Sequence, residues 1–323
     1  MEAATEQRAA GTTGRQQQTL ERVLANVRAL GLSEHLIELE TQGFTTIRGV
    51  LRGAQIDRAK AAIVARVERT TGKPVDVDGE SGKSFVGMQY IPYLLYDDEV
   101  FEEILMEPKP LALITYLLGE SCLLSSIGCH FRGPGGAPLM LHSDNGNGIP
   151  PPFSTTSFVA NVNYALTPYS RAAGALAMVP GSHKLLRQPS AYENFRPRNA
   201  SGADVAAKVR AGESLSSVAW IDPPGVVSMD LDPGDAVVWH GNTWHGSFRR
   251  ELPGVRMNLA VYFNRQFVQT QERHGDAVPA EVLKRHANDE RFKVLLGAKQ
   301  PYGWRREGPD YSVMARNPQG LYD

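Results

Sequence analysis

The sequence contains little cysteine, no long apolar run and no excess of charge of one sign. Its two cysteines, Cys122 and Cys129, cannot build a disulfide framework, and the absence of a C-x-x-C pair argues against a zinc knuckle. Residues 1–18 lack the apolar core of a secretory signal, and no apolar stretch approaches the ~20 residues that cross a bilayer. We therefore expect a cytoplasmic protein with reduced thiols and no membrane contact.

Charge and composition exclude two further classes of protein. The 34 basic and 35 acidic side chains nearly cancel, giving a formal net charge of -1, whereas a dedicated nucleic-acid binder usually carries a basic excess. Hydrophobic residues make up 42% and charged residues 21%, which excludes wholesale disorder. The remaining class is a globular protein, and we expect its partner to be a small molecule.

The order of predicted elements separates a helical start from a β-rich remainder. Residues 1–18 are polar and aperiodic, which predicts a flexible N-terminal tail, and we expect residues 19–323 to form a single domain. Helical periodicity covers residues 20–30, 34–41, 56–69 and 280–296. Short β-like runs between glycine and proline clusters cover 123–131, 138–142, 158–166, 175–179, 226–229, 236–240 and 257–263. The pattern predicts a mainly β sandwich or barrel with flanking helices, in which the polar stretch 192–219 is an insertion.

An H-x-D pattern closes one of the predicted strands. Alternate residues of a strand face the same side, so His142 and Asp144 can point at one metal ion. A lone H-x-D also arises by chance, and the alternative is a strand histidine followed by a turn into Asn145-Gly146. The pattern therefore needs a third ligand to support a metal site.

Two histidines that could supply this ligand lie at the end of another predicted strand. His240 and His245 follow the apolar run that begins at Ala236. Two imidazoles and one carboxylate form the facial triad typical of non-haem Fe(II) oxygenases. Spacing alone does not choose between the two histidines, and the other would be an ordinary core or surface residue.

Arg256 opens the last apolar strand. A buried guanidinium without a partner is costly, so this position calls for an anion. A dicarboxylate cosubstrate would accept the planar fork of an arginine, and Asn258, on the same strand face, could add an amide donor. The alternative is a structural salt bridge to Glu251 or Asp235.

These elements, in this order, resemble the phytanoyl-CoA dioxygenase family of Fe(II)- and 2-oxoglutarate-dependent oxygenases, which includes ectoine hydroxylases and natural-product tailoring enzymes. The resemblance extends to Gly174-Ala175-Leu176 and Pro180-Gly181-Ser182-His183, and upstream to Gly43-Phe44. It covers roughly residues 20–267 and implies a double-stranded β-helix, the cupin-like jelly roll.

The resemblance also implies residue roles. It makes His142, Asp144 and His245 the Fe(II) ligands, and Arg256 the residue that holds the far carboxylate of 2-oxoglutarate. His130 stands where relatives often place a glutamine that contacts this cosubstrate, so we count His130 and Asn258 as cosubstrate-binding candidates. Asp144 keeps the carboxylate that related halogenases lack, which disfavours halogenation.

The substrate is not readable from the sequence. Residues 143–156 form a glycine- and proline-rich loop beside the H-x-D pattern, interpreted either as a lid or as a static connector. Arg132, Phe153 and Trp244 are the substrate-contact candidates, with core packing as the alternative for the two aromatics. No basic cluster suggests a coenzyme A tail.

Three functions therefore remain after the sequence is read. The first is hydroxylation of a small or medium metabolite with O2, releasing succinate and CO2. The second uses the same cofactors for desaturation, epoxidation or oxidative cyclisation in natural-product biosynthesis. The third is a non-catalytic metal-binding jelly roll.

Overall fold

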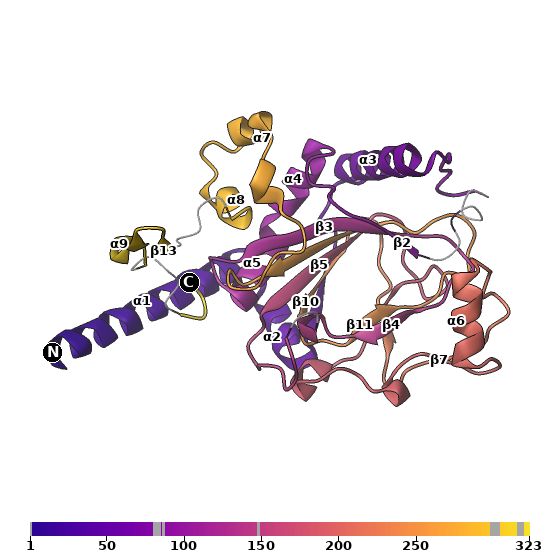
Figure 1. Ribbon diagram of the computed structural model, residues 1–323, viewed down its shortest axis with the longest axis horizontal. Coiled ribbons are helices and arrows are strands. Elements are labelled where there is room, and N and C mark those ends of the chain that lie inside the picture. Colours follow the sequence, from indigo (N-terminus) through magenta and orange to yellow (C-terminus); the bar gives the residue numbers. More distant parts are fainter. Residues whose placement is uncertain (1, 80–84, 86–87, 147–148, 298–303, 315–319) are drawn as a thin grey trace.

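Two antiparallel β-sheets face each other and form the body of the protein (Figure 1). The computed structural model describes residues 2–79, 85, 88–146, 149–297, 304–314 and 320–323. The six strands of the major sheet are, in spatial order, β1 (Phe44–Ile47), β10 (Ala236–His240), β5 (Val159–Ala165), β12 (Asn258–Asn264), β3 (Leu123–Arg132) and β2 (Met88–Ile91). The four strands of the minor sheet are β4 (Leu139–His142), β11 (His245–Ser247), β6 (Leu176–Met178) and β9 (Val227–Ser228). This is the double-stranded β-helix that the sequence predicted.

Side-chain alternation along the strands divides the core into layers. In β10, Val237 and Trp239 pack between the sheets, whereas Ala236 and Val238 join the cluster on the outer face of the major sheet. In β6, Ala177 packs on the opposite side from its neighbours. The strands are buried on both faces, so they read in the sequence as nearly continuous apolar runs.

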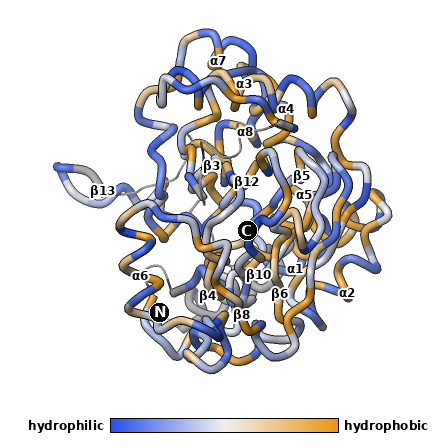
Figure 2. Tube along the Cα trace, turned by 90° about the vertical axis from the view of Figure 1, so that its right-hand side faces the viewer, coloured by the Kyte–Doolittle hydropathy of each residue, from blue (hydrophilic) through white to orange (hydrophobic). Residues whose placement is uncertain are grey.

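Helices cover the outer face of the major sheet. Of these, α5 (Pro108–Leu118) packs directly on β5, β10 and β12, and α3 (Gly53–Thr71) and α4 (Glu99–Leu105) pack against each other and belong to the same hydrophobic cluster (Figure 1). The remaining helices are α1 (Glu2–Ala29), α2 (Ser33–Gln42), α6 (Gly202–Arg210), α7 (Ala280–Arg285), α8 (Glu290–Leu295) and α9 (Tyr311–Met314). The tube in Figure 2 alternates between hydrophilic and hydrophobic colour along these elements, as expected where only one face is buried.

The predicted insertion covers the minor sheet. It contains α6 and β7 (Arg196–Pro197), which pairs with β8 (Trp220–Ile221) directly after it, and Phe195 packs against Phe248 just beyond the end of β11. A second small hairpin pairs β13 (Trp304–Arg305) with β14 (Gly308–Pro309). Within the described residues, no helix combines the length and hydrophobicity that a membrane span requires.

The helices differ from the sequence expectations in three places. A flexible tail was expected over residues 1–18, whereas in the structure α1 begins at Glu2 and projects away from the sheets (Figure 1). Its alanine, glutamate, glutamine and arginine residues favour a helix, yet they form no apolar stripe, so hydrophobic periodicity does not reveal it. The helix expected over 280–296 is divided into α7 and α8, and α5 has no counterpart among the predicted helices.

Candidate metal centre and cosubstrate cavity

Strand pairing brings the two predicted histidine ligands together. His142 and His245 are direct partners in the antiparallel β4–β11 ladder, and their ring centroids lie 4.4 Å apart. Asp144 begins a short 3-10 helix immediately after β4. One potential ligand atom from each of these three residues lies within 4.8 Å of the other two. The structure thus places the predicted triad in a geometry suited to one metal ion.

Backbone carbonyls set the tautomer of both histidines. Nδ1 of His142 lies 3.0 Å from the carbonyl oxygen of Met140, and Nδ1 of His245 lies 3.0 Å from that of Thr243. A carbonyl can only accept, so each Nδ1 carries the hydrogen and each Nε2 keeps its lone pair. The two Nε2 atoms lie 3.6 and 3.4 Å from the Oδ1 and Oδ2 atoms of Asp144. The lone pairs of both Nε2 atoms are therefore available for a metal ion beside the carboxylate of Asp144.

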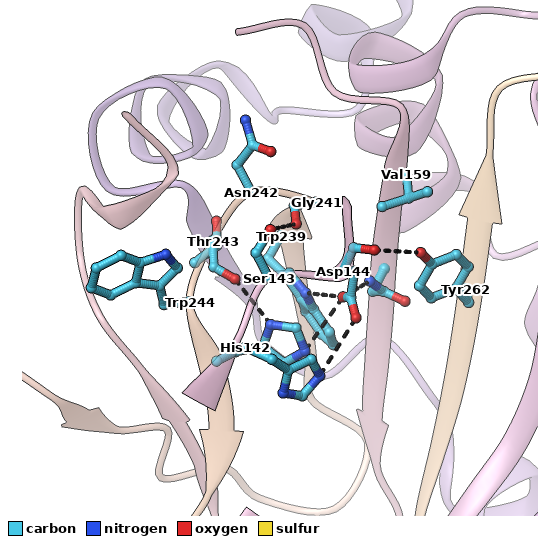
Figure 3. Close-up of polar contacts among 12 residues, drawn as sticks. His142, Ser143, Asp144, Val159, Trp239, Gly241, Asn242, Thr243, Trp244 and Tyr262 are labelled. Carbon is cyan, nitrogen blue, oxygen red and sulfur yellow. Dashed lines mark hydrogen bonds and ion pairs between the residues drawn. The ribbon is translucent and has the colours of Figure 1, made fainter. Parts of the chain in front are cut away.

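Buried donors hold the carboxylate of Asp144 (Figure 3). The side-chain amide of Asn161 donates to Oδ2 at 2.6 Å, and the indole Nε1 of Trp239 donates to the same oxygen at 3.3 Å. Burial alone would raise the pKa of Asp144, but the two triad histidines and Trp239 outweigh it and hold this pKa below its usual range. The carboxylate is therefore ionised at neutral pH.

The two histidine ligands differ in their electrostatic surroundings. Burial lowers the pKa of His245 to about 4, against the opposing charge of Asp144. Burial also disfavours the charged form of His142, but the hydrogen bond and charge of Asp144 outweigh it and raise the pKa of His142. His245 is therefore a neutral imidazole at neutral pH, the form that binds a metal.

His240, the other candidate for the distal ligand, lies outside the triad. Its Nδ1 accepts the backbone N–H of Asn242 at 3.0 Å, and its Nε2 lies 3.3 Å from the carbonyl oxygen of Thr155. Both ring nitrogens therefore bond to backbone groups outside the triad. Burial lowers the pKa of His240 to about 4. Its role in the structure is to fasten the end of the 143–156 loop.

The triad opens into a cavity of about 260 Å³ between the two sheets. The predicted residues that line it are His130, His142, Asp144, His245, Arg256 and Asn258. All the cosubstrate-binding candidates therefore share one cavity with the candidate metal ligands.

Arg256 is buried in this cavity without an anionic partner. Its side chain is 2% exposed, and it donates to the carbonyl oxygens of Gly174 and, at 3.5 Å, His130. The ring of Tyr169 lies 5.0 Å from its guanidinium carbon. No ion pair with Arg256 is found within the part of the chain that the structure describes. A buried guanidinium of this kind favours an incoming carboxylate.

The two salt bridges proposed as alternatives for Arg256 are made by other arginines. Asp235 pairs with Arg48 at 2.6 Å, and Glu251 pairs with Arg249 at 2.8 Å. Both carboxylates are thus occupied away from Arg256, which leaves the structural explanation without its expected partners.

Asn258 and His130 hold each other in place across neighbouring strands. The Oδ1 atom of Asn258 accepts the backbone N–H of His130 at 2.7 Å, and its amide nitrogen donates to Asn163. Burial and the charge of Arg256 lower the pKa of His130 to about 3, so its ring is neutral. Its buried Nδ1 has no hydrogen-bond partner within the described residues, which leaves a polar atom for a ligand.

Sequence reasoning missed several further lining residues, among them Asn161, Asn163, Trp239 and Ser247. The two asparagines were detectable in principle, because they interrupt the apolar run of β5 at alternate positions, and buried polar residues on one strand face usually contact a ligand or each other. Ser247 shares a strand face with His245. The position of Trp239 depends on the register between distant strands.

The three predicted substrate contacts do not line the cavity. Trp244 directly precedes His245 and points away from Asp144 (Figure 3), and its Nε1 donates to the carbonyl of Arg187 at 2.7 Å. Phe153 is 3% exposed and packs in the protein interior. Arg132 is buried behind the cavity wall and bonds to Ser247 and to backbone carbonyls. A substrate contact by any of these three residues stays a prediction that this cavity does not support.

The predicted lid loop is fastened over its second half. Residues 147–148 lie outside the described residues. The backbone N–H of Phe153 donates to the carbonyl of Leu186 at 2.8 Å, and the Asn242 side chain donates to the carbonyl of Ser154 at 2.8 Å. With His240 beside Thr155, these contacts tie residues 153–155 to the rest of the protein. A lid role for the loop stays a prediction.

Comparison with known proteins gives a family and several relatives. The profile described as Phytanoyl-CoA dioxygenase matches residues 39–257, more than half of the chain. Dioxygenase af480 of Aspergillus fumigatus is 28% identical over 225 residues, which cover 68% of this chain and 62% of the fungal protein. The uncharacterised protein Rv1501 of Mycobacterium tuberculosis is 26% identical over 243 residues, covering 68% of each chain.

Two solved structures share the fold. HygX from Streptomyces hygroscopicus, solved with nickel and 2-oxoglutarate bound, has a TM-score of 0.53 at 19% identity and covers 77% of this chain and 92% of its own. SnoK, a non-haem α-ketoglutarate-dependent carbocyclase from nogalamycin biosynthesis, has a TM-score of 0.50 at 20% identity and covers 78% and 90%. These similarities confirm the predicted jelly roll with flanking helices.

The family match covers the triad and most of the residues that line the cavity. Its range of 39–257 contains the triad, His130 and Arg256, so the motifs and the family profile agree on the same part of the sequence. The resemblance that the motifs indicated is confirmed: the chain belongs to the phytanoyl-CoA dioxygenase family.

Proposed function

We propose that this chain is an Fe(II)- and 2-oxoglutarate-dependent dioxygenase that hydroxylates a small or medium metabolite, consuming O2 and releasing succinate and CO2. One observation carries the proposal. A triad of two histidines and one aspartate shares a cavity with a buried arginine for which the described residues provide no anion. The triad suits a divalent iron, and the arginine suits the far carboxylate of 2-oxoglutarate.

The donor set fits the proposed metal. His142 and His245 each present Nε2, because Nδ1 is committed to a carbonyl, and Asp144 is an ionised carboxylate. Two neutral nitrogen ligands and one anionic oxygen ligand suit non-haem iron and leave other coordination positions free for a cosubstrate. When bound, the iron would supply the oxygen activation that the side chains of this chain cannot perform.

The cavity residues have the complementary task of binding and orientation. Arg256 would form charge-assisted hydrogen bonds to the distal carboxylate of 2-oxoglutarate, with Asn258 and His130 beside it. Asn161 and Trp239 hold Asp144 against rotation. The two sheets bury Asp144, Arg256 and Asn258, which shields these three side chains from bulk water.

Conversion of 2-oxoglutarate to succinate in the absence of the metabolite substrate tests the proposal directly. Purified protein supplied with Fe(II), 2-oxoglutarate and O2 should form succinate slowly, and adding a true substrate should accelerate it. The matched control is His245→Ala, which should abolish succinate formation. Metal binding without any succinate, even across a broad metabolite screen, would instead support a non-catalytic metal-binding jelly roll.

Product analysis then decides the reaction type. Hydroxylation adds one oxygen atom to the substrate, whereas desaturation and cyclisation remove two hydrogens with the same consumption of 2-oxoglutarate. Mass spectrometry of the product separates these outcomes, and the position of the substrate in the cavity decides among them.

A further inference from the structure

Ser126 on β3 lies in one cross-strand row with three side chains that contact Asp144. Trp239 on β10 and Asn161 on β5 are register partners, and Asn161 also pairs with Tyr262 on β12, which pairs with Ser126. Trp239 and Asn161 donate to the carboxylate of Asp144, and the Tyr262 hydroxyl donates to its backbone carbonyl at 3.4 Å (Figure 3). Ser126 therefore lines the cavity at the level of the candidate metal, one strand beyond Tyr262.

This end of the cavity is remote from the arginine proposed to hold 2-oxoglutarate. Arg256 precedes Tyr262 by six residues, which span roughly 20 Å of extended chain. Between them, Ala260 pairs with Gly128, so the sheet presents small residues there. A Cβ atom at Gly128 would lie 2.6 Å from the hydroxyl of Tyr90, so glycine lets this ring lie over β3. The space beside the metal level is thus lined by two phenol rings and is left for a second ligand.

Gln271 supplies a hydrogen-bond donor at this end of the cavity. The hydroxyl of Ser126 donates to Oε1 of Gln271 at 2.8 Å, and both residues line the cavity. An amide whose oxygen accepts this hydrogen bond has its nitrogen left, which can only donate. Among the described residues, no acceptor for this Nε2 group is found. Gln271 is therefore oriented by Ser126 as a donor toward a ligand.

The backbone around Gln271 is held without help from its side chain. Its N–H donates to the hydroxyl of Ser125 at 3.0 Å, and the N–H of Glu272 donates to the carbonyl of Ser125 at 2.7 Å. The buried carboxylate of Glu272 accepts the backbone N–H groups of Tyr93 and Ile127 at 2.8 and 2.9 Å. Because these contacts already fasten the segment to β3, the amide of Gln271 is available for another role.

The charged and titrating side chains of the cavity belong to the iron and cosubstrate sites. Among the described lining residues, the acidic, basic and histidine side chains are Asp144, Arg256, His130, His142 and His245. The end near Gln271 offers phenols, a hydroxyl and an amide instead. A charge buried there would lack a counter-ion, which is costly, whereas a neutral oxygen would satisfy the amide donor.

We propose that Gln271 is a specificity-determining residue for the metabolite substrate: its Nε2 donates to a carbonyl, hydroxyl or ether oxygen of an uncharged, mainly apolar molecule that lies between Tyr90 and Tyr262. This inference rests on the proposed oxygenase function. Gln271 follows the residues that the family profile matches, so that profile does not specify this donor. The competing explanation is a surface amide that contacts only Ser126 and solvent.

Three aromatic probes of similar size separate these explanations. Acetophenone carries a carbonyl oxygen, isopropenylbenzene has a CH2 group in place of that oxygen, and benzoate carries a charge. Ligand-observed NMR titrations give the affinity of each probe for protein loaded with Fe(II) and 2-oxoglutarate in the absence of O2. Gln271→Leu and Gln271→Glu both remove the donor. The matched control is Gln269→Leu, at an exposed glutamine that does not line this cavity.

A specificity role predicts a loss that depends on the probe's oxygen. Gln271→Leu should weaken acetophenone binding by roughly 3- to 10-fold, the effect of losing one neutral hydrogen bond. Isopropenylbenzene should bind this variant at least as tightly as the wild type. In Gln271→Glu the affinity for acetophenone relative to isopropenylbenzene should fall by a similar factor, and Gln269→Leu should match the wild type. Benzoate should bind the wild type more weakly than acetophenone.

Several results would overturn the inference. They are equal losses for acetophenone and isopropenylbenzene, no loss for acetophenone, benzoate as the tightest probe, or a wild type that binds none of the three. A parallel fall in 2-oxoglutarate affinity in both Gln271 variants would also overturn it, because the substitution would then disturb the whole cavity. A wild type that does not bind 2-oxoglutarate would instead refute the proposed function itself.

Discussion

His142 and His245 face each other across one antiparallel ladder, and each turns its Nδ1–H to the carbonyl oxygen of the residue two positions earlier. The same local hydrogen bond therefore orients both imidazole rings. Its acceptor is a backbone carbonyl of the segment that carries the ring. The Nε2 atoms are oriented by the fold before any metal arrives, which lowers the cost of ordering the ligands on binding.

The choice of distal ligand can be tested by alanine substitution. His245→Ala should lose most of the bound iron, because the remaining histidine and aspartate cannot complete the triad. His240→Ala should retain iron, because both its ring nitrogens bond to the backbone outside the site. Iron content after anaerobic loading and desalting measures both variants. Retention by His245→Ala and loss by His240→Ala would reverse the assignment.

Arg256 should contribute to cosubstrate binding rather than to the fold. Arg256→Ala loses a charge-assisted pair worth ~2–4 kcal/mol, which weakens 2-oxoglutarate binding by roughly 30-fold or more. Arg256→Lys should recover only part of the affinity, since an ammonium cannot form the planar fork. Titration of 2-oxoglutarate against the iron-loaded variants measures the effect. Normal binding by the folded fraction of Arg256→Ala would make the residue structural.

His240 should make stability depend on pH. Its pKa falls from 6.5 to about 4 on folding, through burial and the nearby charges of His183 and Arg265, so below about pH 6.5 the unfolded chain binds more protons than the folded chain. Wild-type stability should therefore fall as the pH drops from 6.5 to 4, by about 2–3 kcal/mol from this residue. His240→Gln keeps one donor and one acceptor without this titration.

Urea unfolding of both proteins at pH 7.5 and pH 4.5 tests this effect. The stability advantage of the wild type over His240→Gln should shrink at the lower pH. A difference that is the same at both values would show that another group causes the pH dependence.

Phe153 should stabilise the fold without contacting ligands. Phe153→Ala empties a buried site and should lower the free energy of unfolding by ~3–5 kcal/mol. Affinities for iron and 2-oxoglutarate should stay unchanged, because Phe153 does not line the cavity. Phe267→Ala, at a side chain 68% exposed, is the control and should change stability by less than ~1 kcal/mol. A change in substrate selectivity in Phe153→Ala would instead support the substrate contact expected from the sequence.

Most strands that carry the site were predicted well, because their composition and their neighbours agree; the exception is β11, whose three residues gave no β-like run. The run at 236–240 matches β10, and the run at 123–131 differs from β3 by one residue. Turn residues bound these runs, and β-branched and aromatic residues fill them, so local signals suffice. The motif residues of the triad and Arg256 followed from strand parity and from the family resemblance.

The three substrate-contact candidates lie outside the cavity for different reasons. Trp244 and His245 are adjacent, so only one of them can face the cavity, and parity alone would have excluded Trp244. Arg132 shares a strand face with His130, yet it contacts Ser247 and segments beyond the cavity. Its partners are set by how the two sheets stack, which no local pattern records.

The β4–β11 ladder also links iron binding to the order of folding. Its two histidines belong to segments that the chain separates by β5, β6 and β10, so the pair forms only after a long loop closes. Such distant contacts are slow to form, because the chain loses the entropy of loop closure before the strand contacts can stabilise it. Iron uptake during refolding therefore reports completion of the jelly roll, and a chain that has formed only its helices has no triad to offer.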